Sequence, residues 1–163
     1  MNTNPQTTEP LGIFEIGEFL HFRGEFEDSI PFLERALILA EPLQDIDLTW
    51  NILRNLAAAT DSVGQYEEAL YYYREVFAID RERKDKKSQT KHLIKMGEVY
   101  IHSGDLVKGA EFAQDALTIL KTGIEPILSE KEQMEIYFSE FIQTFIDQVS
   151  LEKSPRFLLP LQK

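Results

Sequence analysis

The chain has 163 residues, which is enough for one domain with a sizeable hydrophobic core. Its hydrophobic share of 43% is typical of a globular protein, and its net charge of −11 argues against a surface that binds nucleic acid or an anionic membrane. The absence of cysteine excludes disulfides, thiolate metal sites and a cysteine nucleophile. Residues 1–10 are polar and carry no signal-peptide pattern, and no apolar run is long enough to span a bilayer. We therefore expect a cytoplasmic protein whose residues 1–10 form a disordered segment.

Three short segments recur at a constant interval along the chain, around Gly24, Gly64 and Gly104 (64 − 24 = 40 and 104 − 64 = 40). Apolar residues at helical spacing precede and follow each glycine, and no long stretch alternates with the period of a strand. The pattern predicts a helix, a glycine turn and an antiparallel helix, repeated three times. The expected helices cover about Leu11–Arg23, Phe26–Glu41, Asp47–Val63, Tyr66–Asp85, Lys87–His102 and Leu106–Lys121.

Small residues recur at equivalent places in these helices. The positions in the first helices are Gly17, Ala57 and Gly97, and those in the second helices are Ser29, Ala69 and Gly109. Side chains of this size let two helix backbones approach closely, while the larger residue four positions further along fills the space beside them. The turn glycines are expected to adopt the left-handed conformation that ends a helix.

A seventh helix is predicted over about 129–149, where Ser129 and Glu132 form a capping box. Its broad apolar stripe includes Tyr137, Phe141 and Phe145. This helix has two interpretations: a cap that closes the open end of the third repeat, or a surface for a dimer or another partner. The tail over 151–163 either packs back on the body or docks to a partner.

The repeating pattern resembles the tetratricopeptide repeat, whose signature combines a large residue, Leu-Gly, Tyr, Ala and an aromatic residue. The central copy, from Gly64 to Tyr73, matches closely, and the resemblance covers about 11–122. It implies an all-α fold, a right-handed α-α superhelix (solenoid) of antiparallel helix pairs with about seven helices. The domain would cover 11–150, with repeats at about 11–46, 47–86 and 87–126. The usual repeat is shorter than this interval, at about 34 residues. The difference implies longer second helices and connections, as in the longer repeats of kinesin light chains.

The sequence offers no site for catalysis. The three histidines, His21, His92 and His102, have no partners at the spacing of a metal motif, and the isolated glycines form no phosphate-binding loop. Acidic pairs such as Glu27 and Asp28 lie at helix starts, where they favour the helix dipole. We therefore predict a protein that is not an enzyme, with no cofactor and no metal.

The resemblance places a binding groove on the concave face, which the first helices of the repeats line. The residues expected there are Phe14, Glu18, His21, Phe22, Asn51, Arg54, Asn55, Lys91, Ile94, Lys95, Glu98 and His102. Phe14 and Phe22 would form an apolar anchor. In tetratricopeptide co-chaperones that hold a C-terminal carboxylate, an Asn of the second repeat and a basic pair of the third bind the ligand; Asn55, Lys91 and Lys95 stand at the matching places. Phe14 and Glu18 stand where the first repeat of that family supplies Lys and Asn.

The sequence leaves two hypotheses for the function of the protein. The first is a non-catalytic protein-interaction module, an adaptor, scaffold or assembly chaperone, that binds a peptide or protein segment in the groove. The partner would carry an acidic segment or a C-terminal carboxylate. The alternative is a homodimerising regulatory or assembly subunit that acts through the seventh helix and the tail.

Overall fold

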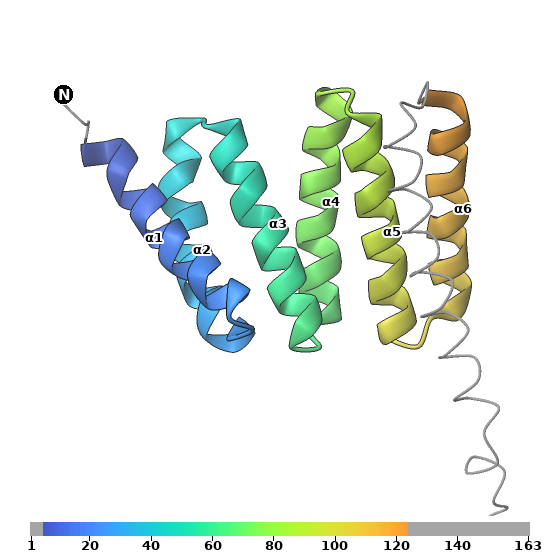
Figure 1. The fold of residues 1–163 in the computed structure, drawn as a ribbon, viewed down its shortest axis with the longest axis horizontal. Coiled ribbons are helices and arrows are strands. Elements are labelled where there is room, and N and C mark those ends of the chain that lie inside the picture. Colours follow the sequence, from blue (N-terminus) through green and yellow to red (C-terminus); the bar gives the residue numbers. More distant parts are fainter. Residues whose placement is uncertain (1–4, 124–163) are drawn as a thin grey trace, which may run out of the picture. The chain divides into compact units, whose positions relative to one another are not determined.

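The structure of the protein, a computed structural model, describes residues 5–123 (Figure 1). Within this range the chain forms α-helices and one short 3-10 turn, and no strand. The first helix pair is α1 (Pro5–Phe22) and α2 (Phe26–Ala40), followed by the 3-10 turn η1 (Glu41–Leu43). The second pair is α3 (Ile46–Ser62) and α4 (Tyr66–Glu82), and the third is α5 (Lys86–His102) and α6 (Leu106–Gly123). The expected all-α fold of helix pairs is confirmed.

The chain divides into two compact units, with the boundary between Ser88 and Gln89 near the start of α5. We call them the N-terminal unit, which contains α1–α4, and the C-terminal unit, which contains most of α5 together with α6. In the N-terminal unit α1 packs on α2, α3 packs on α4, and α2 packs on α3. Helix α1 also contacts α3, so the first helices of the two repeats are neighbours.

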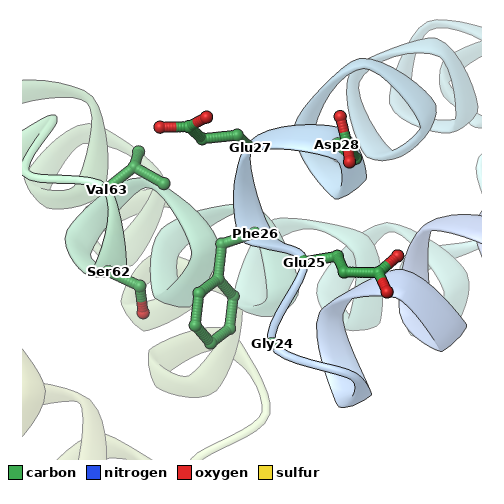
Figure 2. Close-up of a pocket in the computed structure, with 7 residues that line it drawn as sticks. All are labelled: Gly24, Glu25, Phe26, Glu27, Asp28, Ser62 and Val63. Atoms are coloured by element: carbon green, nitrogen blue, oxygen red, sulfur yellow. The ribbon is translucent and has the colours of Figure 1, made fainter.

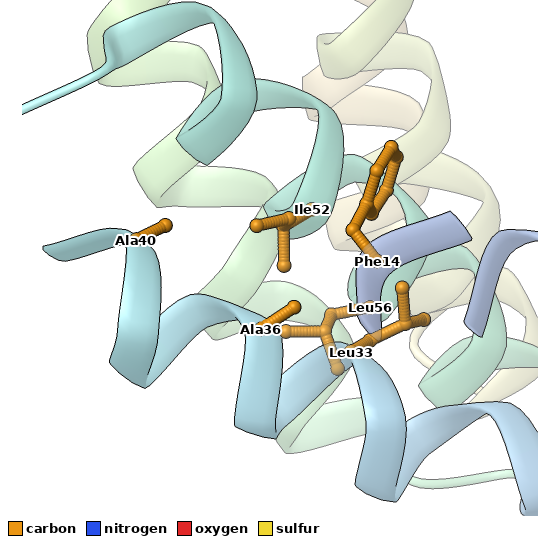
Figure 3. Packing of buried hydrophobic residues seen from close by; sticks show 6 residues of the cluster. All are labelled: Phe14, Leu33, Ala36, Ala40, Ile52 and Leu56. Atoms are coloured by element: carbon orange, nitrogen blue, oxygen red, sulfur yellow. The ribbon is translucent and has the colours of Figure 1, made fainter. Parts of the chain in front are cut away.

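The core of the N-terminal unit joins its two repeats. One cluster of buried side chains comes from α1, α2 and α3 (Figure 3), and the partly buried Ile30, Leu37 and Tyr72 pack against it. The cluster consists of Phe14, Leu33, Ala36, Ala40, Ile52 and Leu56. A second cluster, Leu53, Val76 and Ile79, holds α3 against α4. Burial of these apolar side chains is the main stabilising contribution to the helix packing.

The turn glycines have the predicted conformation. The φ angles of Gly24, Gly64 and Gly104 are 78°, 80° and 90°. After Gly64 the chain closes the helix end with a hydrogen bond of 2.8 Å from the Gln65 amide to the Thr60 carbonyl. A side chain in this left-handed region costs roughly 1–2 kcal/mol, which is the reason for glycine at each turn.

The predicted close approach of helices is also confirmed. A Cβ atom added to Gly17 would lie 2.9 Å from Leu33 Cδ2 and 3.3 Å from the Leu33 backbone nitrogen, across the α1–α2 contact. In the C-terminal unit, a Cβ on Gly109 would lie 2.7 Å from Ile101 Cγ1. These helices pack at a distance that only a residue without a side chain allows.

Two helix ends differ from the expectation. Helix α1 begins at Pro5 and so includes residues 5–10, which were predicted to be disordered. Proline is tolerated in the first turn because the missing amide would have had no partner there, and Pro10 further along is buried. Helix α4 ends at Glu82, before the predicted Asp85, because Lys84 adopts a left-handed φ of 57°.

The length of the repeat is shared by both helices of each pair and not concentrated in the second helices as predicted, because α3 and α5 each have 17 residues and α2 has only 15. Helix α4 has 17 residues and α6 has 18, and the connection from α2 to α3 contains the turn η1. The predicted seventh helix over 129–149, with Tyr137, Phe141 and Phe145, and the tail over 151–163 lie outside the described residues.

Candidate functional site

The predicted groove residues are distributed over both units. Those on α1 and α3 belong to the N-terminal unit, whereas those on α5 belong to the C-terminal unit. Each group is therefore described separately. We use the name α1–α3 face for the first group, which contains Phe14, Glu18, His21, Phe22, Asn51, Arg54 and Asn55.

The apolar anchor predicted on α1 is wrong in one of its two residues. Phe14 is 7% exposed and belongs to the core cluster with Ile52 and Leu56, whereas Phe22 is 88% exposed. Because α1 also contacts α3, the buried sector of α1 is wide enough to include Phe14.

Two buried polar nitrogens without partners lie on the α1–α3 face. Asn55 is 6% exposed, and neither its Nδ2 nor the buried Nδ1 of His21 has a hydrogen-bond partner among the described residues. Burial lowers the pKa of His21 from its ordinary value of 6.5, the Arg54 charge lowers it further, and Glu18 opposes both effects. His21 is therefore neutral at pH 7. Its ring packs edge-on against the ring of Phe26, with 5.1 Å between the two ring centres.

Arg54 is held by an aromatic ring rather than by a carboxylate. Its guanidinium carbon lies 5.2 Å from the centre of the Trp50 ring, one helical turn earlier on α3. The described residues supply no ion pair to Arg54, and the residue is half-buried. The charge of Arg54 is thus oriented but not neutralised. The neighbouring Asn51 is different, because its side-chain amide already donates to the Asp47 carbonyl at 2.9 Å.

Sequence reasoning missed the group that orients Arg54. Trp50 Nε1 donates a hydrogen bond of 2.7 Å to Oδ1 of Asp80, a residue on α4 that is 1% exposed. The guanidinium carbon of Arg83 lies 6.0 Å from the centre of the Trp50 ring, and Arg83 Nη2 forms an ion pair with Asp47 Oδ1 at 2.6 Å. The only available signal was the single tryptophan of the chain, four positions before Arg54. Its carboxylate partner is 30 residues away, so only the packing of α3 on α4 reveals it.

On α5 the predicted basic pair is partly neutralised. Lys95 Nζ lies 2.7 Å from Glu98 Oε2, so two residues of the predicted groove pair with each other. Ile94 is fully buried and cannot contact a ligand without rearrangement. Lys91 is half-buried and His102 is exposed.

A separate hollow of about 480 Å³ lies at the turn between α1 and α2 and is bordered by the end of α3 (Figure 2). Its lining residues are Gly24, Glu25, Phe26, Glu27, Asp28, Ser62 and Val63. The three carboxylates point in different directions in Figure 2, and the Phe26 ring lies between Ser62 and the turn at Gly24. Glu27 and Asp28 lie in the first turn of α2, where they stabilise the helix dipole. This arrangement agrees with the structural role predicted for the acidic pairs.

The comparisons with known proteins decide the family. Residues 11–82 match the family model of the tetratricopeptide repeat. These residues carry tetratricopeptide repeats. The TPR domain of Arabidopsis FLU is similar to the chain, with a TM-score of 0.64 and 26% identity over 72% of this chain and 99% of that domain. A comparison with curated protein sequences finds no significant match.

A second solved structure has the same fold. It is a Podosopora anserina protein assigned as a kinesin light chain, with nearly identical TPR-like repeats. The TM-score is 0.57 and the identity is 16%, over 93% of this chain and 77% of that chain. This likeness concerns the fold alone.

TPR domains in general bind other proteins or peptides, and the family is typically non-catalytic. Among residues 5–123 no group of three or more histidine or carboxylate side chains is placed to hold a metal ion. No helix in that range has the length and apolar character needed to cross a membrane.

Proposed function

We propose that this protein is a non-catalytic interaction module, an adaptor, scaffold or assembly chaperone, that binds a peptide segment on the α1–α3 face. The observation that carries the proposal is a pair of buried nitrogens on the α1–α3 face, Asn55 Nδ2 and His21 Nδ1, to which residues 5–123 supply no hydrogen-bond partner. A buried polar group without a partner costs about 1–3 kcal/mol. A ligand that supplies the missing hydrogen bond recovers part of this free energy.

The chemistry of these groups indicates the ligand. An asparagine amide that donates from a buried position suits the backbone carbonyl of an extended peptide. Arg54, oriented by Trp50 and without a carboxylate partner on the described residues, suits an acidic side chain or a C-terminal carboxylate. We therefore propose that the partner presents an acidic or C-terminal segment, with Asn55 reading its backbone and Arg54 its charge.

The contributions of the predicted residues are unequal in this proposal. Arg54 and Asn55 carry most of the affinity of the α1–α3 face, whereas Lys95 in the C-terminal unit is already paired with Glu98. Glu18 is exposed on α1 and disfavours a carboxylate at the His21 end of the face. The acidic group of the ligand is therefore expected beside α3 rather than beside α1.

Peptide titration tests the proposal. The probe is an acidic octapeptide with a free C-terminus, compared with the same peptide amidated, and the signal is the fluorescence of Trp50, the only tryptophan. Arg54→Gln keeps polar donors but removes the charge, so we expect affinity to fall by about tenfold or more, because buried charge pairs are worth several kcal/mol at interfaces. Asn55→Ala should also weaken binding.

The matched control is Arg35→Gln on α2, an exposed arginine of a second helix. It should leave the affinity unchanged. The double change Lys91→Ala/Lys95→Ala should have a smaller effect than Arg54→Gln. Equal affinities for Arg54→Gln and Arg35→Gln, or no binding of either peptide, would refute the acidic-ligand proposal.

The alternative function as a homodimerising subunit acts through residues outside the described range and stays a prediction. The cytoplasmic location stays a prediction as well.

A further inference from the structure

Helix α1 presents large apolar side chains to solvent on the side that is turned away from its own core. Phe19 is 58% exposed and Phe22 is 88% exposed, and Leu11 and Ile16 are 44% and 47% exposed. A fully buried aromatic side chain covers roughly 150–250 Å², so the two phenylalanines alone leave roughly 200–350 Å² in contact with water. Apolar patches of a few hundred Å² mark interaction sites on soluble domains. We call these four residues the α1 outer face.

The corresponding positions in the second repeat indicate what the α1 outer face packs against. One repeat further along, Ile16 corresponds to Leu56 and Phe19 to Ala59, and both of these are fully buried. Leu56 lies in the core cluster against which Ile30 and Leu37 of α2 pack. Phe32 on α2 is 39% exposed, whereas its counterpart Tyr72 packs on the same cluster. The part of the α1 outer face formed by Ile16 and Phe19 is therefore the surface by which a repeat stacks on a preceding amphipathic helix.

The charges around this face select the kind of helix that fits. Residues 1–46 contain nine carboxylates and two arginines. Glu9, Glu15 and Glu18 are exposed on α1, and Arg23, which lies 5.7 Å from the Phe19 ring, is paired with Glu25 at 2.9 Å. A second copy of this chain would bring an equally acidic segment against the first, which like-charge repulsion disfavours. A cationic partner gains both from apolar burial and from charge complementarity.

We propose that the α1 outer face docks a basic amphipathic helix of another protein, with aliphatic side chains seven residues apart like Ile30 and Leu37. The apolar side chains of that helix would cover Phe19 and Ile16, and its lysines or arginines would lie against Glu15 and the neighbouring carboxylates. This site shares only Phe22 with the α1–α3 face, so it would let the protein hold two partners of opposite charge.

The test uses the full chain and two synthetic peptides that copy Phe26–Ala40, the helix on which the equivalent surface of the second repeat packs. One peptide keeps its native charges, and the other carries Glu27→Lys, Asp28→Lys and Glu34→Lys. Fluorescence anisotropy of the labelled peptides measures their affinity. We expect the lysine peptide to bind at least about tenfold more tightly than the native-charge peptide, and more weakly as salt is raised.

Protein variants locate the site. Phe19→Ala should weaken binding of the lysine peptide by at least about tenfold, the effect of losing an aromatic anchor. Tyr71→Ala on α4, where the side chain is 57% exposed, is the matched control and should change nothing. Glu15→Lys, a surface change that leaves the core intact, should weaken the lysine peptide and strengthen the native-charge peptide. The acidic octapeptide should bind the Phe19→Ala variant normally, which separates this site from the α1–α3 face.

Equal binding of the two copied peptides, equal affinities for Phe19→Ala and Tyr71→Ala, or no binding of the lysine peptide would overturn the proposal. Light scattering adds one further outcome. If the chain is a dimer that Phe19→Ala converts into a monomer, a second copy covers the α1 outer face and the proposed basic partner is wrong.

Discussion

Two glycines of the same helix should respond in opposite directions to the same substitution. Gly17 and Gly12 both lie in α1, and alanine at either position gains about 0.5–1 kcal/mol from helix propensity. An added Cβ at Gly12 meets nothing within 4 Å. At Gly17 it would lie 2.9 Å from both Cγ and Cδ2 of Leu33, well inside the roughly 3.5–4.0 Å of a normal carbon contact.

Relief of the contact at Gly17 requires a shift of the helix pair. Leu33 is fully buried in the core cluster, and its backbone nitrogen lies only 3.3 Å from the added atom, so a change of side-chain rotamer does not remove the clash. Overpacking of this kind costs about 1–3 kcal/mol. Gly17→Ala should therefore lower the free energy of unfolding by about 1–2 kcal/mol, whereas Gly12→Ala should raise it by about 0.5–1 kcal/mol.

Urea and thermal unfolding followed by Trp50 fluorescence measure both effects, because Trp50 lies in the same unit as α1. At this chain length about 1 kcal/mol corresponds to a change in Tm of roughly 2–4 °C. Leu33→Val should be less destabilising in the Gly17→Ala background than in the native protein, since it removes a clashing atom. A Gly17→Ala variant that is as stable as the native protein, or two variants that shift in the same direction, would refute the reasoning.

Three further changes test other parts of the structure. Lys84→Gly should raise stability by about 1 kcal/mol, because Lys84 has a φ of 57°, and Gly64→Ala at φ 80° should lower it by at least as much; urea unfolding compares the two, and no difference in sign would contradict the turn geometry. Trp50→Phe removes the hydrogen bond to the buried Asp80 and should cost about 1–3 kcal/mol, whereas an unchanged Tm would show that this bond is dispensable. The folded-state pKa of His21 lies below 6.5, so its contribution to stability is present above that pH and is lost as pH falls below it; the decrease in Tm on going from neutral to mildly acidic pH should be smaller in His21→Gln, and an equal decrease would exclude His21 as a cause.

The repeat architecture could be read from local signals. Helix period, the glycine spacing and the recurrence of small residues depend on short stretches of chain, so the predicted helices begin and end close to those of the structure. The ends that differ, at Pro5 and Glu82, are places where burial of Pro10 or the left-handed Lys84 decided the boundary. Neither the burial of Pro10 nor the left-handed conformation of Lys84 can be recognised from a short stretch of sequence.

By itself, the sequence determined that this protein is built from three helix pairs with glycine turns, since these features follow from backbone geometry within a single repeat. Only the tertiary structure decided which faces of those helices remain available. Phe14 is buried because α1 has two neighbours, Lys95 is neutralised by Glu98, and Arg54 is oriented by a tryptophan whose partner lies 30 residues away on α4. Exposure and charge pairing depend on how many elements surround a side chain, and the period of a single helix does not contain that information.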